Sequence, residues 1–245
     1  MAVLALGLFL GVRHATDSDH VVAVSTIVSR ERTTRAALRI GALWGLGHTF
    51  SILMMGGTIV VFGLVIPPRL GLSMEMSVAA MLVVLGVMNV SGAKRNLHVA
   101  AHGEPAPAGE AGEAADPAEH AGSLRSEPRI ATRSLLARLR PLVVGVIHGL
   151  AGSAAIALLV LSTIRSVGQA LLYLAVFGAG TVLGMLLLTA VVALPMAAAA
   201  RRFASFEPLL ARATGVVSIA FGIFLGYQIG FVEGLFSANM TWSPK

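Results

Sequence analysis

The feature that most constrains this chain is a series of apolar runs close to the length that crosses a bilayer. A transmembrane helix needs about 20 predominantly apolar residues. Six segments qualify, at about 2–28, 40–66, 75–92, 141–164, 169–198 and 212–236. The sequence therefore predicts an all-α integral membrane protein with six transmembrane helices.

Composition excludes the main soluble alternatives. Only 12% of the 245 residues are charged and 56% are hydrophobic, which leaves too little charge to cover the surface of a soluble domain. The net charge of +6 does not indicate a nucleic-acid partner, because aromatic residues are scarce and the basic residues form short clusters between apolar runs. The chain has no cysteine, so disulfides and thiolate metal ligands are excluded.

The basic residues predict the orientation in the membrane. The loops after the first, third and fifth apolar segments hold 14 of the 18 Lys and Arg residues. Lys and Arg concentrate in cytoplasmic loops, so these three loops are expected inside the cell and both termini outside. The apolar N-terminus lacks a basic leader and a cleavage site, which predicts a retained span. We expect a multi-pass protein of the bacterial inner membrane.

Short motifs recur in the two halves of the chain. Gly11-Val-Arg-His14 aligns with Gly145-Val-Ile-His148, and Trp44-Gly-Leu-Gly47 aligns with Phe177-Gly-Ala-Gly180. A third pair, Leu85-Gly-Val-Met88 and Phe221-Gly-Ile-Phe224, follows in the same order. A repeat of three spans must insert its second copy upside down, so the sequence predicts two inverted three-helix repeats, as in secondary transporters.

The predicted division is a first repeat at 1–92, a loop at 93–138 and a second repeat at 139–245. The loop is rich in Ala, Gly, Glu and Pro and has no apolar period, which predicts a disordered cytoplasmic segment. Whether its histidines, His98, His102 and His120, collect metal stays open.

The first apolar segment contains a polar cluster, His14-Ala-Thr-Asp17-Ser-Asp19-His20. Ionisable groups in the bilayer each cost about 2.5–3.5 kcal/mol on insertion scales, so such clustering indicates a function. At about 100° per residue, His14 and Asp17 share a helical face whereas Asp19 points away. Either the helix unwinds locally, or Asp19 supports a ligand from behind. A structural ion pair between Asp19 and Arg13 is the plainer alternative.

Two further histidines lie at a similar depth in other apolar segments. His20, His48 and His148 are each eight to ten residues from a flanking arginine, which places them roughly 12–15 Å from the cytoplasmic boundary, near the middle of a ~30 Å core. Imidazole and carboxylate groups suit nickel, cobalt, zinc, copper or iron. A hydrogen bond to a neighbouring helix is the alternative role for His148. The predicted metal site comprises His14, Asp17, Asp19, His20, His48 and His148.

These motifs resemble those of a known family. His14-Ala-Thr-Asp17-Ser-Asp19-His20 resembles the HxxxxDH signature of the nickel/cobalt transporter (NiCoT) family, and Leu46-Gly-His48-Thr-Phe resembles its second signature. The stretch from His148 to Ala154 is similar to a motif of the short, six-span, urease-accessory-type nickel permeases. The resemblance implies that His14, Asp19, His20 and His48 act in metal binding and transport.

The resulting hypothesis is a secondary transporter of Ni²⁺ or Co²⁺ with a midplane site, working by rocking one repeat against the other. No nucleotide-binding motif is present, and no cofactor or enzymatic activity is expected. The expected partners are the metal ion and the bilayer; a metallochaperone or a second copy of the chain stays open. Two alternatives remain: an intramembrane metalloenzyme, although HExxH is lacking, and a metal efflux or sensing protein of the same fold.

Overall fold

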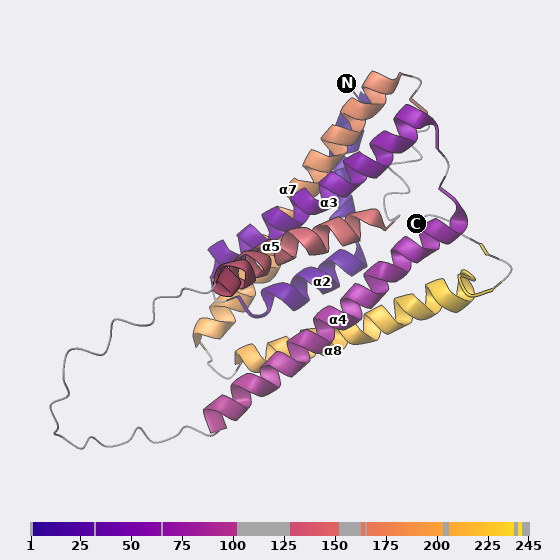
Figure 1. Cartoon of the computed structure of the whole chain (residues 1–245). Coiled ribbons are helices and arrows are strands. Elements are labelled where there is room, and N and C mark those ends of the chain that lie inside the picture. The colour runs from indigo at the N-terminus through magenta and orange to yellow at the C-terminus, as the bar shows by residue number, and fades with distance from the viewer. Residues whose placement is uncertain are drawn as a thin grey trace, which may run out of the picture.

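The computed structural model describes residues 2–31, 33–64, 66–101, 128–151, 163–164, 166–202, 206–237 and 240–241. Every regular element within these ranges is a helix, and Figure 1 shows how the helices are arranged. In chain order they are α1 (Ala2–His14), α2 (Ser18–Val28), α3 (Thr34–Phe62), α4 (Pro68–Ala101), α5 (Pro128–Leu150), α7 (Val167–Arg202), α8 (Phe206–Tyr227) and the π-helical turn η1 (Gln228–Val232).

Four stretches are long and apolar enough to cross a membrane: Thr34–Phe62, Pro68–Gly92, Val167–Ala199 and Pro208–Val232. They correspond to the second, third, fifth and sixth predicted spans and confirm the all-helical membrane class. The first predicted span is divided between α1 and α2. The fourth is described as α5 up to Leu150, and most of its predicted continuation lies outside the described residues. The same holds for positions 102–127 of the predicted loop, which α4 and α5 flank.

The first span breaks at the polar cluster. α1 ends at His14 and α2 begins at Ser18. Between them the amide of Thr16 donates to the carbonyl of Arg13 at 2.9 Å, that of Asp17 donates to the carbonyl of His14 at 3.1 Å, and the backbone of Asp17 is extended. Local unwinding, one of the two alternatives left open by the sequence, is therefore present, and it places His14 on a different helix from Asp19 and His20.

The helices pair between distant parts of the chain. α1 lies along α7, α3 lies along both α5 and α7, and α4 lies along α8 (Figure 1). The short α2 contacts α4, α7 and α8, so it joins the α4–α8 pair to the other helices. Each of these four extensive helix–helix interfaces joins a helix before residue 102 to a helix after residue 127.

Glycines allow these helices to approach closely. A Cβ at Gly11 would collide with the Phe177 carbonyl on α7, and a Cβ at Gly145 would collide with the Trp44 carbonyl on α3. Gly86 on α4 lies equally close to the backbone of Gly215 on α8. Small residues at such crossings allow backbone-to-backbone contact, which is how helices commonly associate in membranes.

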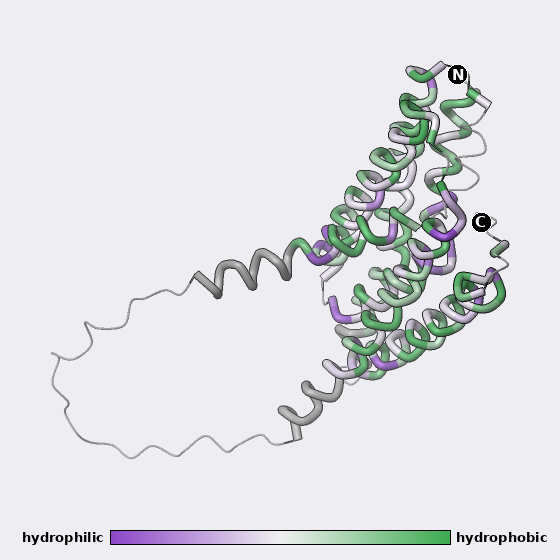
Figure 2. Tube along the Cα trace, turned by 45° about the vertical axis from the view of Figure 1, so that its right-hand side comes forward, coloured by the Kyte–Doolittle hydropathy of each residue, from purple (hydrophilic) through white to green (hydrophobic). Residues whose placement is uncertain are grey.

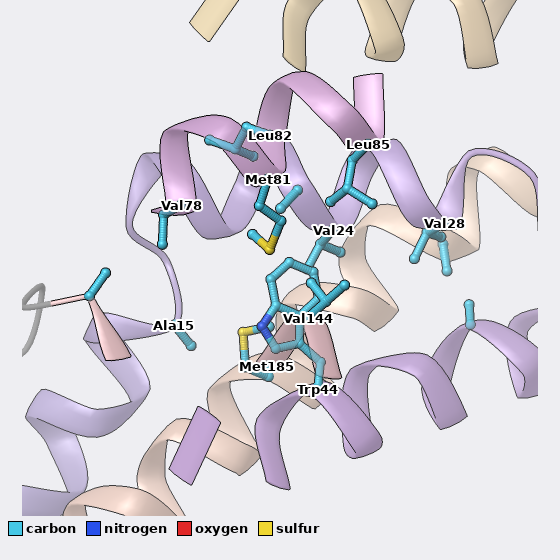
Figure 3. Packing of buried hydrophobic residues seen from close by; sticks show 14 residues of the cluster. Ala15, Val24, Val28, Trp44, Val78, Met81, Leu82, Leu85, Val144 and Met185 are labelled. Carbon is cyan, nitrogen blue, oxygen red and sulfur yellow. The ribbon is translucent and has the colours of Figure 1, made fainter. Parts of the chain in front are cut away.

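Within the described part of the chain, the buried apolar residues form three clusters between the helices. Figure 3 shows Trp44 and Met185 packed with Val24, Leu85 and Val144. Hydrophobic residues run along much of each helix (Figure 2), and many large apolar side chains are exposed, with Phe62, Val191 and Phe236 each more than two-thirds exposed. Large exposed apolar surface is anomalous in water. It is the expected surface for a protein whose solvent is lipid.

Candidate metal site

Four buried histidines converge from four helices. They are His14 at the end of α1, His20 on α2, His48 on α3 and His148 near the end of α5, and none is more than 6% exposed. The ring of His20 is central: its centroid lies 4.9 Å from that of His14, 5.0 Å from that of His48 and 4.3 Å from that of His148.

Local sequence explains this convergence. The break after His14 turns the chain, so that α2 presents His20 toward the side chain that ends α1. On the other side, Gly149 packs directly against the backbone of His48, because it has no Cβ to hold α3 and α5 apart. Two helix ends and one glycine crossing therefore bring the four rings together.

Asp17 orients His14. Its carboxylate lies 2.8 Å from Nδ1 of His14. A carboxylate oxygen accepts, so Nδ1 carries the proton and Nε2 of a neutral His14 has a free lone pair. That Nε2 lies 2.9 Å from Nε2 of His48. The two ring nitrogens therefore face one another inside the cluster.

Asp19 bridges two histidines. One carboxylate oxygen lies 3.2 Å from Nδ1 of His20 and also accepts from the His20 amide at 3.0 Å, while the other lies 2.7 Å from Nε2 of His148. By the same reasoning, the remaining lone pairs of the neutral rings are on Nε2 of His20 and Nδ1 of His148. Histidine ligands of metals characteristically donate their second ring N–H to a carboxylate, as these do.

Three ring nitrogens in the cluster are buried without a hydrogen-bond partner among the described residues: Nε2 of His20, Nδ1 of His48 and Nδ1 of His148. Leaving a buried polar atom unsatisfied costs about 1–3 kcal/mol. A bound cation would use such lone pairs, so their accumulation at one place fits a metal site better than a purely structural network.

The donor atoms form two groups that share His20. His14, His20 and His48 form one group, and Asp19, His20 and His148 form the other, with the donor atoms in each lying within 4.8 Å of one another. Nitrogen and oxygen ligands about 2.0–2.2 Å from a tetrahedral metal lie roughly 3.4 Å apart. A small inward movement would close either group on an ion.

The structure brings together all six residues predicted to form the site, but it gives them different positions. Asp17 contacts His14 alone in the cluster, and its side chain is 42% exposed, against 16% for Asp19. The alternative pair between Asp19 and Arg13 is not among the ion pairs of the described chain, where Asp19 pairs with His20 and His148. His102 and His120 lie outside the described residues, and His98 belongs to α4 but lies in a stretch whose side chains are not described.

Two aromatic residues complete the walls of the cluster. The Trp44 ring lies 5.5 Å from the His148 ring and 6.3 Å from the His20 ring, and the Phe177 ring lies 5.7 Å from that of His14. Sequence reasoning used both residues only as matching positions of the repeat. Their matching positions were the available signal, because equivalent residues of two inverted copies can flank one shared site.

Comparison with known proteins now adds independent information. The family model described as high-affinity nickel-transport protein, NicO, matches residues 1–243. The urease accessory protein UreH of Bacillus sp. (strain TB-90) is 36% identical over 239 residues, covering 96% of this chain and 95% of that protein. No solved structure matches.

Proposed function

The chain belongs to the NicO family of high-affinity nickel-transport proteins, and from this premise we propose that the ion passes through the buried histidine cluster near the middle of the membrane. The protein is a nickel or cobalt transporter and not an enzyme, and the metal ion is its substrate. The proposal rests on one observation: four buried histidines converge, and two carboxylates hold a ring nitrogen of three of them, His14, His20 and His148.

The charges of the cluster suit a divalent cation. Asp17 and Asp19 supply two negative charges, and the neutral histidines supply lone pairs. Such an arrangement is costly when empty, because the largely buried carboxylate of Asp19 needs a compensating charge. Imidazole and carboxylate together match the ligand preference of Ni²⁺ and Co²⁺.

The two donor groups give the ion two successive positions. Asp17 is the more exposed carboxylate, so the ion enters beside it and binds between His14 and His48. It then moves to the group of Asp19 and His148, and His20 remains a ligand throughout because it belongs to both groups. This sharing avoids a fully desolvated, unliganded ion between the two positions.

Inverted repeats are supported by matching helix contacts. The sequence alignment pairs Gly11 with Gly145 and Trp44 with Phe177. In the structure Gly11 lies against the Phe177 carbonyl, and Gly145 lies against the Trp44 carbonyl. The second contact is thus the first with the two copies exchanged.

The third helices of the repeats repeat this exchange. Gly86 lies against Gly215 and Ile219, and Gly222, which aligns with Gly86, lies against Ala79 and Val83. The alignment that pairs Gly86 with Gly222 also pairs Ala79 with Gly215 and Val83 with Ile219.

This packing favours a different motion during transport from the rocking of one whole repeat against the other. Helices of the two repeats interleave, so separating the repeats would break every major helix contact. The α4–α8 pair has fewer contacts with the other helices than its members have with each other. We therefore expect alternating access to move α4 and α8 together against α1, α3, α5 and α7, with both termini outside and the arginine-rich loops in the cytoplasm.

Flux through the purified protein tests the site. We expect proteoliposomes containing the wild-type chain to move Ni²⁺ or Co²⁺, and His20→Ala to reduce this flux at least 100-fold, because both donor groups lose their common ligand. Flux is followed with a metal-sensitive dye inside the vesicles. His98→Ala is the matched control, since it also removes one histidine but not one of the six residues predicted to form the site. If the His20→Ala variant carried the metal ion as fast as the wild-type protein, this route for the ion would be ruled out.

A further inference from the structure

A second polar site lies at the arginine-rich end of the molecule, away from the histidine cluster. It is a cavity of about 870 Å³ between α2, α3, α4 and α5. Arg30, Arg39 and Arg140 line it, and Glu31 is the one acidic residue among its lining residues. The lining is therefore strongly positive, which is unsuited to a divalent cation and suited to an anion.

Arg30 is fixed in place by its neighbours. Its guanidinium donates to both the side-chain oxygen and the backbone carbonyl of Asn89. Asn89 is buried and in turn donates to the Thr26 carbonyl at 2.9 Å and to the Ser29 hydroxyl at 3.0 Å. This part of the cavity is thus organised before any ligand arrives, which reduces the entropy lost on binding.

Arg39 and Arg140 lack a charge partner. Neither forms an ion pair with a carboxylate within the described chain, and Arg140 makes only a 3.3 Å contact with the sulfur of Met88. Guanidinium groups bind phosphate oxygens through two parallel hydrogen bonds, so Arg39 and Arg140 match a phosphate group. Arg30, whose Nε and Nη2 donate to Asn89, adds its positive charge beside them.

The position of the cavity selects a lipid. Arg39 and Arg140 immediately precede the apolar parts of α3 and α5, so they lie where the hydrocarbon core meets the headgroups. The cavity wall continues into the apolar residues Leu43 and Leu85. Met88 and Leu139 also line it and are exposed, so the cavity meets the outer surface beside them.

We propose that this cavity binds the headgroup of an anionic phospholipid, with the phosphate between Arg30, Arg39 and Arg140 and the start of an acyl chain along the apolar wall. Basic cavities between transmembrane helices are known to bind anionic lipid headgroups. The general excess of Lys and Arg in cytoplasmic loops explains why arginines lie at this end of the protein. It does not explain why three of them line one cavity. Arg35 lies on α3 one turn before Arg39 and does not line the cavity. The assignment needs only the membrane embedding of the chain and is independent of the route of the ion.

Lipid titration of the purified full-length protein tests the assignment. Native mass spectrometry would follow binding of dioctanoyl phosphatidylglycerol, the matching phosphatidylcholine and inorganic phosphate, all without nickel. We expect phosphatidylglycerol to bind at about tenfold lower concentration than phosphatidylcholine, and the double variant R39Q/R140Q to lose this preference. The control R35Q removes one positive charge from the same end of α3, and we expect this variant to keep the preference for phosphatidylglycerol.

Three results would overturn the assignment. They are equal binding of the two lipids, an equal loss in R35Q, and phosphate binding as tight as that of phosphatidylglycerol, which would make the cavity a site for free phosphate. If R39Q/R140Q does not elute as a folded protein, R39K/R140K replaces it. This variant keeps the charge but removes the planar guanidinium fork, so the preference should fall by about threefold. Unchanged preference in R39K/R140K would also contradict the proposal.

Discussion

At the scale of single residues, Asp19 differs from Asp17 in how many histidines depend on it. Asp19 holds ring nitrogens of both His20 and His148, whereas Asp17 holds only that of His14. We expect Asp19→Asn to reduce Ni²⁺ affinity by about 100-fold or more and Asp17→Asn by about tenfold, because each lost carboxylate frees the rings that it oriented. Titration calorimetry on the purified variants would measure both values. The reverse order would show that the bridging position of Asp19 does not matter.

The residue types of the site could be predicted from the sequence, but which carboxylate contacts which histidine could not. Charged and imidazole side chains stand out in an apolar span, which is why His14, Asp17, Asp19 and His20 were identifiable. The bridge from Asp19 to His148 joins residues 129 positions apart. No local periodicity encodes such a contact, because it depends on how α2 and α5 are placed relative to each other.

At the scale of helices, the glycine crossings are the least replaceable parts of the fold. Gly145 on α5 faces the Trp44 backbone directly, whereas a Cβ on Gly57 of α3 would meet only the side chain of Leu171 at 3.8 Å. Gly145→Ala should lower stability by about 1–3 kcal/mol, because α3 and α5 must separate. Gly57→Ala should be neutral or stabilising by up to about 1 kcal/mol, since alanine favours helix.

Thermal unfolding in detergent compares the two glycine variants. A midpoint temperature of unfolding that falls for Gly145→Ala and is unchanged for Gly57→Ala would support the close contact of α3 and α5 at Gly145. Equal midpoints would show that α3 and α5 have room to adjust.

The apolar runs predicted the helices well, and helix geometry left two alternatives for the first span, of which local unwinding is present. The extension of α4 to Ala101 could not be read from hydropathy, because its last residues leave the apolar run and continue as helix. Which helices pair was likewise not encoded locally. A helix that is apolar on all sides gives no periodic signal for the face that meets a neighbour.

At the scale of the whole molecule, the absence of cysteine makes the orientation directly testable. Pro67 precedes α4 on the side predicted to be outside, and Arg35 lies in the first turn of α3 on the side predicted to be cytoplasmic; both are exposed. In intact cells we expect a membrane-impermeant maleimide to label Pro67→Cys but not Arg35→Cys. Arg35→Cys should react only after permeabilisation. The opposite pattern would invert the chain in the membrane.

His20 belongs to both donor groups, and its Nδ1 is already held by Asp19. A single imidazole lone pair can bind only one metal ion at a time. On the route proposed above, the two positions are therefore mutually exclusive, so one ion cannot wait behind another as in a multi-ion channel. We then expect nickel and cobalt to compete for a single place in each cycle, and the protein to carry one ion at a time.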